Sequence, residues 1–271
     1  MSLVNTPSGQ DQAEGLRSIF GQDTSKVICL ACALDPDTIV HVGHGTAMSI
    51  KNNGSSVLLI DEVPLAERRT MSGFLYPTKY DLGQVFTNSV ALSKSIRQIE
   101  EKFWYATGAK VRHFFEERRA KYPTLEDRLR SIHTPIDYLV LATDNPDHNI
   151  LNLYGATIQR ILIAAPEIES LTIAMNMIRK MSLFQDNQAL PTLIVGGTEE
   201  EANAAFVKLN EASQSALSLP LEMLGWIQAI KIKRVTIDPE DLSVTEVSDG
   251  PASEFVLPLS FFDQLKQKIT E

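Results

Sequence analysis

The stretch from Val27 to Asp61 decides the fold of this chain, because it holds two buried strands separated by a helix. It begins with Val27-Ile28-Cys29-Leu30-Ala31 and ends with Val57-Leu58-Leu59-Ile60-Asp61. Both runs are continuously apolar, as in strands of a parallel sheet that is covered on both faces. Residues from about 40 to 53 can form a helix between them. The stretch therefore predicts a βαβ unit whose second strand ends in a carboxylate.

The turn after the first strand lacks the residues that bind phosphate in units of this kind. A phosphate-binding turn is rich in glycine, so that backbone N–H groups can approach the ligand, and it ends in Lys followed by Ser or Thr. Here Pro36 removes an N–H donor, and Asp35 and Asp37 would repel a phosphate. Gly43 and Gly45 come too late to serve. The full turn reads Cys32-Ala33-Leu34-Asp35-Pro36-Asp37-Thr38-Ile39-Val40.

Length and charge restrict the possible classes of protein. A chain of 271 residues buries roughly three quarters of its unfolded surface and can form one domain without disulfides or metals. Its net charge of −9 disfavours binding to nucleic acid, which depends on clustered Lys and Arg. The polar start, Met1 to Gln10, contains no apolar signal core, and no run approaches the length of a membrane span. We expect a cytoplasmic protein.

Two short patterns have a chemical interpretation and a structural one. Cys29 and Cys32 form a C-x-x-C pair, which can be a redox motif or half of a metal site. The favoured interpretation is structural, because Cys29 lies in a buried strand and no second pair completes a zinc site. Asp144, Asp147 and His148 could likewise bind a metal, but turns are rich in Asp and Asn for backbone reasons. We therefore expect no metal site.

The rest of the chain alternates between apolar strands and longer helices. We predict further strands over residues 136–143, 160–165, 191–195 and 221–226. We predict helices over residues 11–20, 88–103, 114–130, 168–184, 199–217 and 261–269. This alternation predicts an α/β fold with a doubly wound, mainly parallel sheet flanked by helices. We expect residues 1–20 to form a tail with a short partner-binding helix, and residues 21–271 to form a single α/β domain.

Four segments carry a resemblance to a known family. They are Asp11-Gln12-Ala13-Glu14-Gly15-Leu16-Arg17, Asn53-Gly54-Ser55-Ser56-Val57-Leu58-Leu59-Ile60-Asp61, Ala165-Pro166-Glu167-Ile168-Glu169-Ser170-Leu171-Thr172 and Leu221-Glu222-Met223-Leu224-Gly225-Trp226-Ile227. With them the chain resembles the MinD/ParA group of P-loop ATPases, and within it the flagellar-number regulator FlhG, also called FleN. The first segment matches the D-Q-A-x-x-L-R head of FlhG, and the other three are shared by the wider group.

The resemblance implies a nucleotide site whose usual residues are replaced. The family's phosphate loop, G-K-G-G-x-G-K-T followed by Ser or Thr, places its signature lysine on Leu34, its second lysine on Ile39 and its magnesium-binding threonine on Val40. The aspartate that orients the attacking water falls on Val63, and the family's adenine-contacting asparagine falls on Gly196.

A second group of positions keeps part of the family pattern. The switch-II aspartate falls on Ala142, with Thr143 retained, and a small shift brings Asp144 to that position. Asp61 is also retained. Loss of the loop, the magnesium site, the water-positioning site and the base site together predicts a pseudo-ATPase that has no catalytic residue and needs no cofactor.

The resemblance also implies a partner. In FlhG the head segment engages the signal-recognition-type GTPase FlhF, so we expect partner binding through Asp11, Gln12, Ala13, Leu16 and Arg17. This predicts an inactive FlhG-like protein of bacterial flagellar placement or number control, recruited to the cell pole through its partner. Equally, Ala13 and Leu16 could pack on the sheet together with Phe20.

Two other functions stay open. The chain could be an active ATPase in which Lys51, Arg68 or Arg69 supplies the missing charge, or a scaffold for other cell-pole or partition machinery. The sequence leaves open whether the chain forms a homodimer or a heterodimer.

The last predicted helix is a candidate membrane anchor. It carries two basic residues, Lys266 and Lys268, beside an apolar face. Two basic residues contribute only about 2 kcal/mol at an anionic surface. We therefore expect no strong membrane binding.

Overall fold

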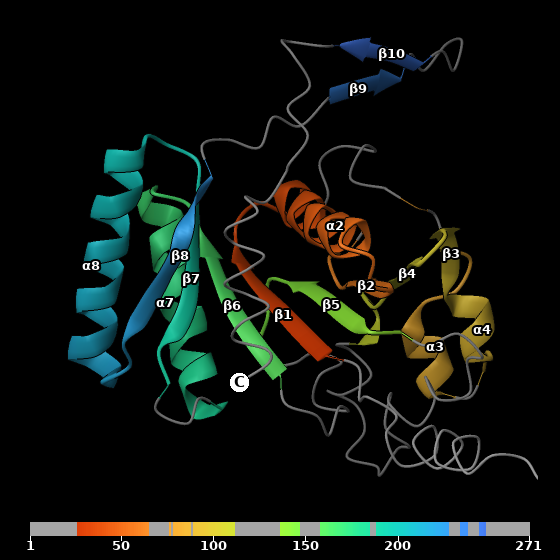
Figure 1. The fold of residues 1–271 in the computed structure, drawn as a ribbon, viewed down its shortest axis with the longest axis horizontal. Helices are drawn as coiled ribbons and strands as arrows, with labels where there is room; N and C mark the ends of the chain where they lie inside the picture. The colour runs from red at the N-terminus through yellow and green to blue at the C-terminus, as the bar shows by residue number, and fades with distance from the viewer. Residues whose placement is uncertain are drawn as a thin grey trace, which may run out of the picture.

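A computed structural model of the chain describes residues 26–64, 76, 78–87, 89–111, 136–146, 158–184 and 188–227, and the backbone of two strands at 234–237 and 244–247. Its main body is an eight-stranded sheet in the order β3-β4-β2-β5-β1-β6-β7-β8 (Figure 1). All neighbouring pairs are parallel except β3 and β4. The predicted fold class, a doubly wound and mainly parallel sheet flanked by helices, is confirmed.

The strands of this sheet are β1 (Lys26–Ala33), β2 (Val57–Asp61), β3 (Arg97–Glu100), β4 (Phe103–Thr107), β5 (Tyr138–Thr143), β6 (Ile158–Ala164), β7 (Leu190–Val195) and β8 (Leu221–Ile227). The helices are α2 (Pro36–Asn52), α3 (Leu82–Phe86), α4 (Leu92–Ser95), α7 (Ile168–Met181), the 3₁₀ turn η4 (Ser182–Phe184) and α8 (Glu199–Leu217). Strands β9 (Arg234–Ile237) and β10 (Val244–Val247) pair antiparallel in a second sheet.

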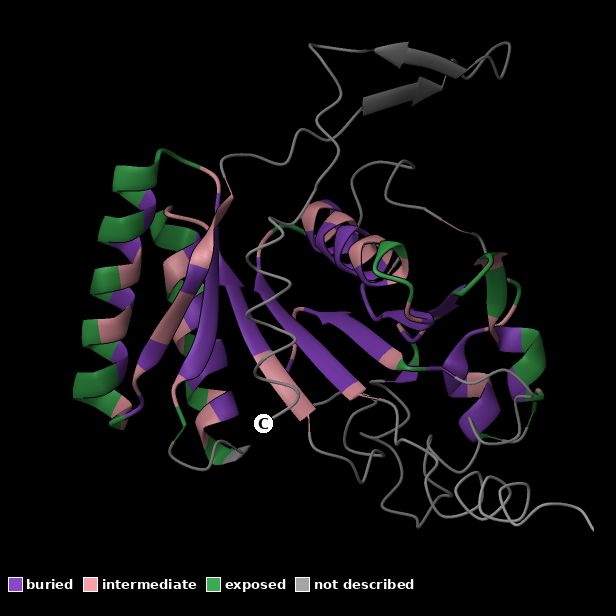
Figure 2. Ribbon diagram, viewed as in Figure 1, coloured by how far each residue is buried: buried purple, intermediate pink, exposed green. Residues whose placement is uncertain are grey.

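Side chains of β1 alternate between two cores because successive residues of a strand point to opposite faces. Ile28 and Leu30 join the core beneath α2, whereas Ala31 and Ala33 join the core beneath α7 and α8. On that second face, α3 and α4 cover the other half of the sheet. Figure 2 shows β1 and β5 buried along most of their length. The sheet is thus the middle of three layers.

The two cysteines of the C-x-x-C pair lie in β1, on opposite faces of the sheet. Cys29 packs in the core with α3 and α4, and Cys32 packs beneath α2. Both are fully buried, and burial raises the pKa of the Cys29 thiol to about 12. The interpretation of Cys29 as a buried small hydrophobe is confirmed, and the opposite orientation prevents a disulfide between the two.

Several predicted elements are confirmed with small shifts at their ends. Strand β2 and helix α8 have the predicted bounds, and β5, β6, β7 and β8 differ from them by one or two residues. Helix α7 begins at the predicted residue and ends in η4. The predicted helices at 11–20, 114–130 and 261–269 lie outside the described residues.

The predicted helix over residues 88–103 is wrong. Among the described residues of this range, only Leu92–Ser95 is helical; β3 follows, and Phe103 opens β4. A tight turn separates the two strands, with Lys102 in the left-handed region at a φ of 63°. The run Phe103-Trp104-Tyr105-Ala106-Thr107 has strand-forming residues, and its pairing with β2 holds it extended. Helix α3 was likewise not predicted.

The described part of the chain carries neither a helix long and apolar enough to cross a membrane nor a group of three metal-binding side chains. Asp147 and His148 of the possible metal cluster lie outside it.

Candidate functional site

The carboxyl ends of the parallel strands meet along one edge of the sheet, which is where ligands bind in doubly wound folds. Strands β1, β2, β5 and β7 reach this edge at Ala33, Asp61, Thr143 and Val195. The structure therefore brings most of the predicted site positions to one edge. The predicted positions that lie at or beside these ends are Leu34, Asp61, Val63, Ala142, Thr143, Asp144 and Gly196, whereas Ile39 and Val40 lie inside α2.

The connection from β1 to α2 is shorter than the sequence predicted. Strand β1 continues to Ala33 and α2 begins at Pro36, which leaves only Leu34 and Asp35 between them. The predicted turn over residues 32–40 and the predicted helix start near residue 40 are therefore wrong. Asp35 is an N-cap and Pro36 occupies the first helical turn, a pair of residues typical of a helix start.

Asp35 at the start of α2 forms its hydrogen bonds within the helix itself. The Asp35 carboxylate accepts a hydrogen bond from the Thr38 backbone N–H at 3.0 Å and another from the Thr38 hydroxyl. The Asp35 carbonyl accepts from the Ile39 N–H at 3.0 Å. Pro36 has no N–H. A negative side chain thus occupies the helix end that would otherwise attract an anion.

The three positions predicted to correspond to the family's loop lysines and threonine are packing residues here. Ile39 and Val40 are 1% and 2% exposed in the core between α2 and the sheet, and Leu34 packs against the same core. All three are apolar because this side of α2 faces the sheet. The local pattern is therefore that of a helix packed from its first turn.

Gly43 brings α2 close to the sheet beside Ala142. A Cβ atom on Gly43 would lie 2.8 Å from the Ala142 Cβ and 3.2 Å from the Leu59 Cδ1. Ala142 is itself buried between its neighbours in register, Leu30 and Asp61. Small side chains at both positions allow the close approach, so Gly43 has a packing role.

The retained Asp61 is buried and hydrogen-bonded within the fold. Its Oδ1 accepts from the Val63 N–H at 3.0 Å, and its Oδ2 accepts from the Tyr105 hydroxyl at 2.8 Å. Its carbonyl accepts from the Gly108 N–H at 2.8 Å. Asp61 therefore joins the ends of β2 and β4. Val63, the residue predicted at the water-positioning position, is also buried.

The retained Thr143 and the neighbouring Asp144 begin the turn after β5. Thr143 is fully buried, and its hydroxyl accepts from the Asn145 N–H at 3.0 Å. Lys180 of α7 donates to the Asn145 Oδ1 at 3.0 Å, which ties the turn to that helix. Asp144 is half-buried.

Gly196, the residue predicted at the base-contacting position, lies in the turn from β7 to α8. Its φ of 91° is in the left-handed region that favours glycine. Its N–H donates to the Ile227 carbonyl at 2.7 Å, and its carbonyl accepts from the Trp226 Nε1 at 2.9 Å. These two bonds connect the turn to β8.

Ser170 joins three elements at this edge and was missed at the sequence level. Its hydroxyl donates to the Ala33 carbonyl at 2.5 Å and accepts from the Ala165 N–H at 2.8 Å. It thereby connects the ends of β1 and β6 with the first turn of α7. The available signal was a serine on the otherwise apolar buried face of α7, which continues through Ala174 and Met177.

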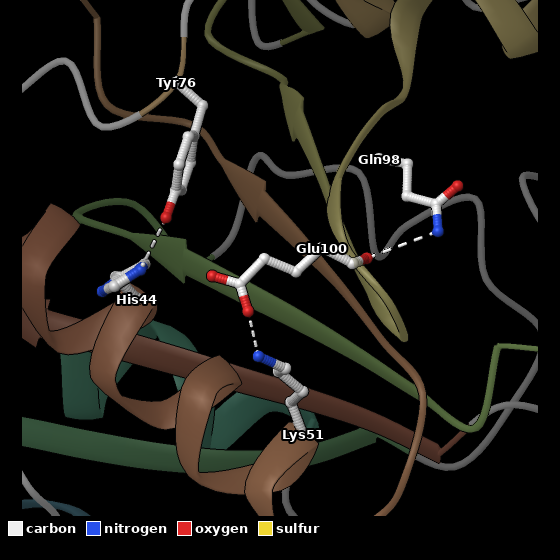
Figure 3. Close-up of polar contacts among 5 residues, drawn as sticks. All are labelled: His44, Lys51, Tyr76, Gln98 and Glu100. Atoms are coloured by element: carbon white, nitrogen blue, oxygen red, sulfur yellow. Dashed lines mark hydrogen bonds and ion pairs between the residues drawn. The ribbon is translucent and has the colours of Figure 1, made fainter.

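The far end of α2 holds the basic residue proposed for an unconventional site. Lys51 lies in the last turn of α2. At a rise of 1.5 Å per residue, this turn is about 22 Å from the start of the helix. Lys51 forms an ion pair with Glu100 (Figure 3). His44, nearer the middle, shares a hydrogen bond of 3.0 Å with the Tyr76 hydroxyl. Lys51 is therefore too far from the β1–α2 connection to act there.

Arg68 and Arg69, the other basic residues proposed for an unconventional site, lie outside the described residues. The predicted partner-binding residues also lie outside them; these are Asp11, Gln12, Ala13, Leu16 and Arg17.

No protein-family model and no curated protein matches the sequence. Solved structures share the fold. The cell division ATPase MinD of Pyrococcus furiosus is 13% identical, with 75% of this chain and 83% of that chain covered and a TM-score of 0.50. A putative plasmid partition protein of Borrelia burgdorferi bound to AMPPNP is 16% identical, with 90% and 99% covered and a TM-score of 0.50.

A third solved structure has a different chemistry. Cobyrinic acid a,c-diamide synthase of Mycobacterium smegmatis, with bound ADP and magnesium, is 12% identical, with 69% and 82% covered and a TM-score of 0.51. This chain has the fold of the MinD/ParA-type P-loop NTPases. At these identities the likeness concerns the fold alone, because one fold can carry several functions.

Proposed function

We propose that this chain is a catalytically inactive MinD-like protein that acts by binding other proteins. The observation that carries the proposal is the two-residue connection between β1 and α2, Leu34 and Asp35. A phosphate cradle needs several consecutive backbone N–H groups that point toward the ligand. The connection is too short to form one, and the Asp35 carboxylate already occupies the helix start.

The residues at this edge do not fit ATP and magnesium. Each lysine–phosphate contact contributes about 1.5–3 kcal/mol, so Leu34 and Ile39 at the two lysine positions remove about 3–6 kcal/mol. That corresponds to about a hundred-fold to ten-thousand-fold weaker binding. Lysine side chains from elsewhere would have to compensate, and Lys51 is paired with Glu100 at the far end of α2.

Calorimetry tests the inactive site directly. ATP with magnesium titrated into the full chain should give no heat above dilution, while the Pyrococcus furiosus MinD protein titrated in the same buffer serves as positive control. Size exclusion should give one elution volume with and without nucleotide. A micromolar dissociation constant for ATP would reject the proposal.

The partner that we propose is an FlhF-like GTPase, bound through the head segment Asp11–Arg17 in flagellar placement or number control. Support comes from the D-Q-A-x-x-L-R pattern of this segment. Deletion of residues 1–20 should leave the domain folded and abolish pull-down of the GTPase. Equal pull-down by the truncated chain would assign binding to another surface.

An active ATPase is the second candidate. It is favoured by the nucleotides in the solved neighbours, AMPPNP in the partition protein and ADP with magnesium in the synthase. Magnesium-dependent phosphate release that survives repurification of the chain would favour this candidate over the first.

A further inference from the structure

A groove with a volume of about 620 Å³ runs between α7 and α8. Pro166 and Gly197, in the turns that lead into the two helices, form its end at the carboxyl edge of the sheet. From there it follows α8 for about 16 Å, the rise between Glu201 and Ala212 at 1.5 Å per residue. The groove is therefore about three helical turns long.

The walls of the groove present small and aliphatic side chains at helical spacing. Helix α8 contributes Ala204, Ala205 and Ala212, and α7 contributes Leu171 and Met175. Small residues on one wall leave a valley between two ridges, which is the shape that accepts the ridge of a third helix. Figure 2 shows the outward side of α8 exposed over most of its length.

An aliphatic side chain stands at the mouth of the groove. Ile168, the first residue of α7, lines it and is 85% exposed. Exposed aliphatic residues beside an apolar groove are typical of a protein-binding surface.

Charge is distributed unevenly along the groove. Glu167 and Glu201 line the end near the sheet edge, and Glu199 and Glu200 lie in the adjoining first turn of α8. Glu201 is held in place because its Oε2 accepts from the Thr198 N–H at 2.8 Å. The basic residue among those that line the groove, Lys208, lies about two turns farther along α8. The end near the sheet edge therefore favours a cationic partner.

We propose that this groove binds an amphipathic helix of another protein, with aliphatic residues on its inner face and Lys or Arg at the end that lies over Glu167 and Glu201. The helix would use the i, i+3/i+4, i+7 anchors of helix-in-groove recognition. The inference rests on the proposed action through partners and names a second binding surface, distinct from the head segment.

A synthetic peptide tests this directly. The probe is a fluorescein-labelled helical peptide of about 15 residues with leucines at these anchor positions and lysines at one end, and its counterpart carries glutamates instead. In fluorescence anisotropy with the full chain, the lysine peptide should bind at least ten-fold more tightly than the glutamate peptide. Ile168→Ala should weaken binding about ten-fold.

Leu183→Ala is the matched control, because Leu183 is 80% exposed, follows the other end of α7 and lies outside the groove. It should leave binding unchanged. Glu167→Lys should reverse the preference between the two peptides. Circular dichroism should report folded protein for all three variants, since the side chains of Glu167, Ile168 and Leu183 are exposed.

The proposal fails if the lysine peptide does not bind at about 1 mM, if both peptides bind equally, or if Leu183→Ala weakens binding as much as Ile168→Ala does. Self-association of the chain that Ile168→Ala removes would identify a second copy as the occupant and also reject it. ATP calorimetry on the same samples separates the two proposals. Binding of ATP would reject the inactive nucleotide site and leave the groove proposal standing, whereas absence of peptide binding would reject only the groove proposal.

Discussion

The β1–α2 corner and the α7–α8 groove lie at the same edge of one sheet but differ in the size of their side chains. At the corner, Leu34, Ile39 and Val40 pack into the core, and Asp35 bonds to the helix start. At the groove, alanines of α8 leave an open valley with Ile168 at its mouth. The fold alone therefore does not decide where the edge of a sheet can bind a partner, because large side chains fill one corner and small side chains leave another open.

The largest expected change in stability follows from placing a lysine at position 39, where the resemblance predicts the second lysine of the phosphate loop. Ile39→Lys should lower the free energy of unfolding by about 4 kcal/mol, because it buries an unpaired ammonium group in an apolar core. Val207→Lys on the exposed side of α8 should change it by less than about 0.5 kcal/mol. Urea denaturation measures both. A similar effect of the two variants would show that the corner is not tightly packed.

Gly43→Ala tests how close α2 lies to the sheet. The new Cβ would overlap the Ala142 Cβ, and overpacking costs about 1–3 kcal/mol, partly offset by the better helix propensity of alanine. We expect a net loss of about 1–2 kcal/mol in the free energy of unfolding. In the background of Ala142→Gly the same substitution should cost at least about 1 kcal/mol less. Additive effects in this double-mutant cycle would contradict the contact.

Asp35→Ala removes the cap of α2. Loss of an N-cap side chain costs about 1 kcal/mol, and thermal unfolding should report a decrease of that size. Asp35→Gly should cost only a few tenths of a kcal/mol, which provides the comparison. Neither variant should bind ATP, because the short connection is unchanged. ATP binding by Asp35→Ala would show that the carboxylate alone blocks the site.

The pH dependence of stability should show the smallest effect. Burial lowers the pKa of His41 below its ordinary value of 6.5, although the nearby charges of Asp37 and Asp35 act to raise it, and burial also lowers the pKa of His44. Between the folded-state pKa values and about pH 6.5, the unfolded chain binds more protons than the folded chain does. The free energy of unfolding therefore rises with pH across this window and falls when the solution is acidified. His41→Gln should flatten the slope measured by urea denaturation from pH 7 to pH 5. An unchanged slope would assign it to other groups.

Some elements could be predicted from the sequence because their signals are local. Helix α8 begins with the capping box of Thr198 and Glu201 and has the predicted bounds, and the run Val57–Asp61 is apolar enough to be a buried strand in any context. The alternation of such strands with helices also predicted the parallel sheet. Residues 88–103 carried no comparable signal, since the extended form of Phe103–Thr107 depends on pairing with β2, which is distant in sequence.

At the candidate site, the sequence shows apolar residues where the resemblance predicts a lysine at 34 and 39, a threonine at 40 and an aspartate at 63. What these positions do instead depends on how the elements pack in three dimensions. That Ile39 and Val40 face the core, that Gly43 meets Ala142, and that Cys29 and Cys32 face opposite cores all depend on how α2 and the strands are placed. The α7–α8 groove was equally hidden, because it forms only when the two helices, which strand β7 separates along the chain, pack side by side on the sheet.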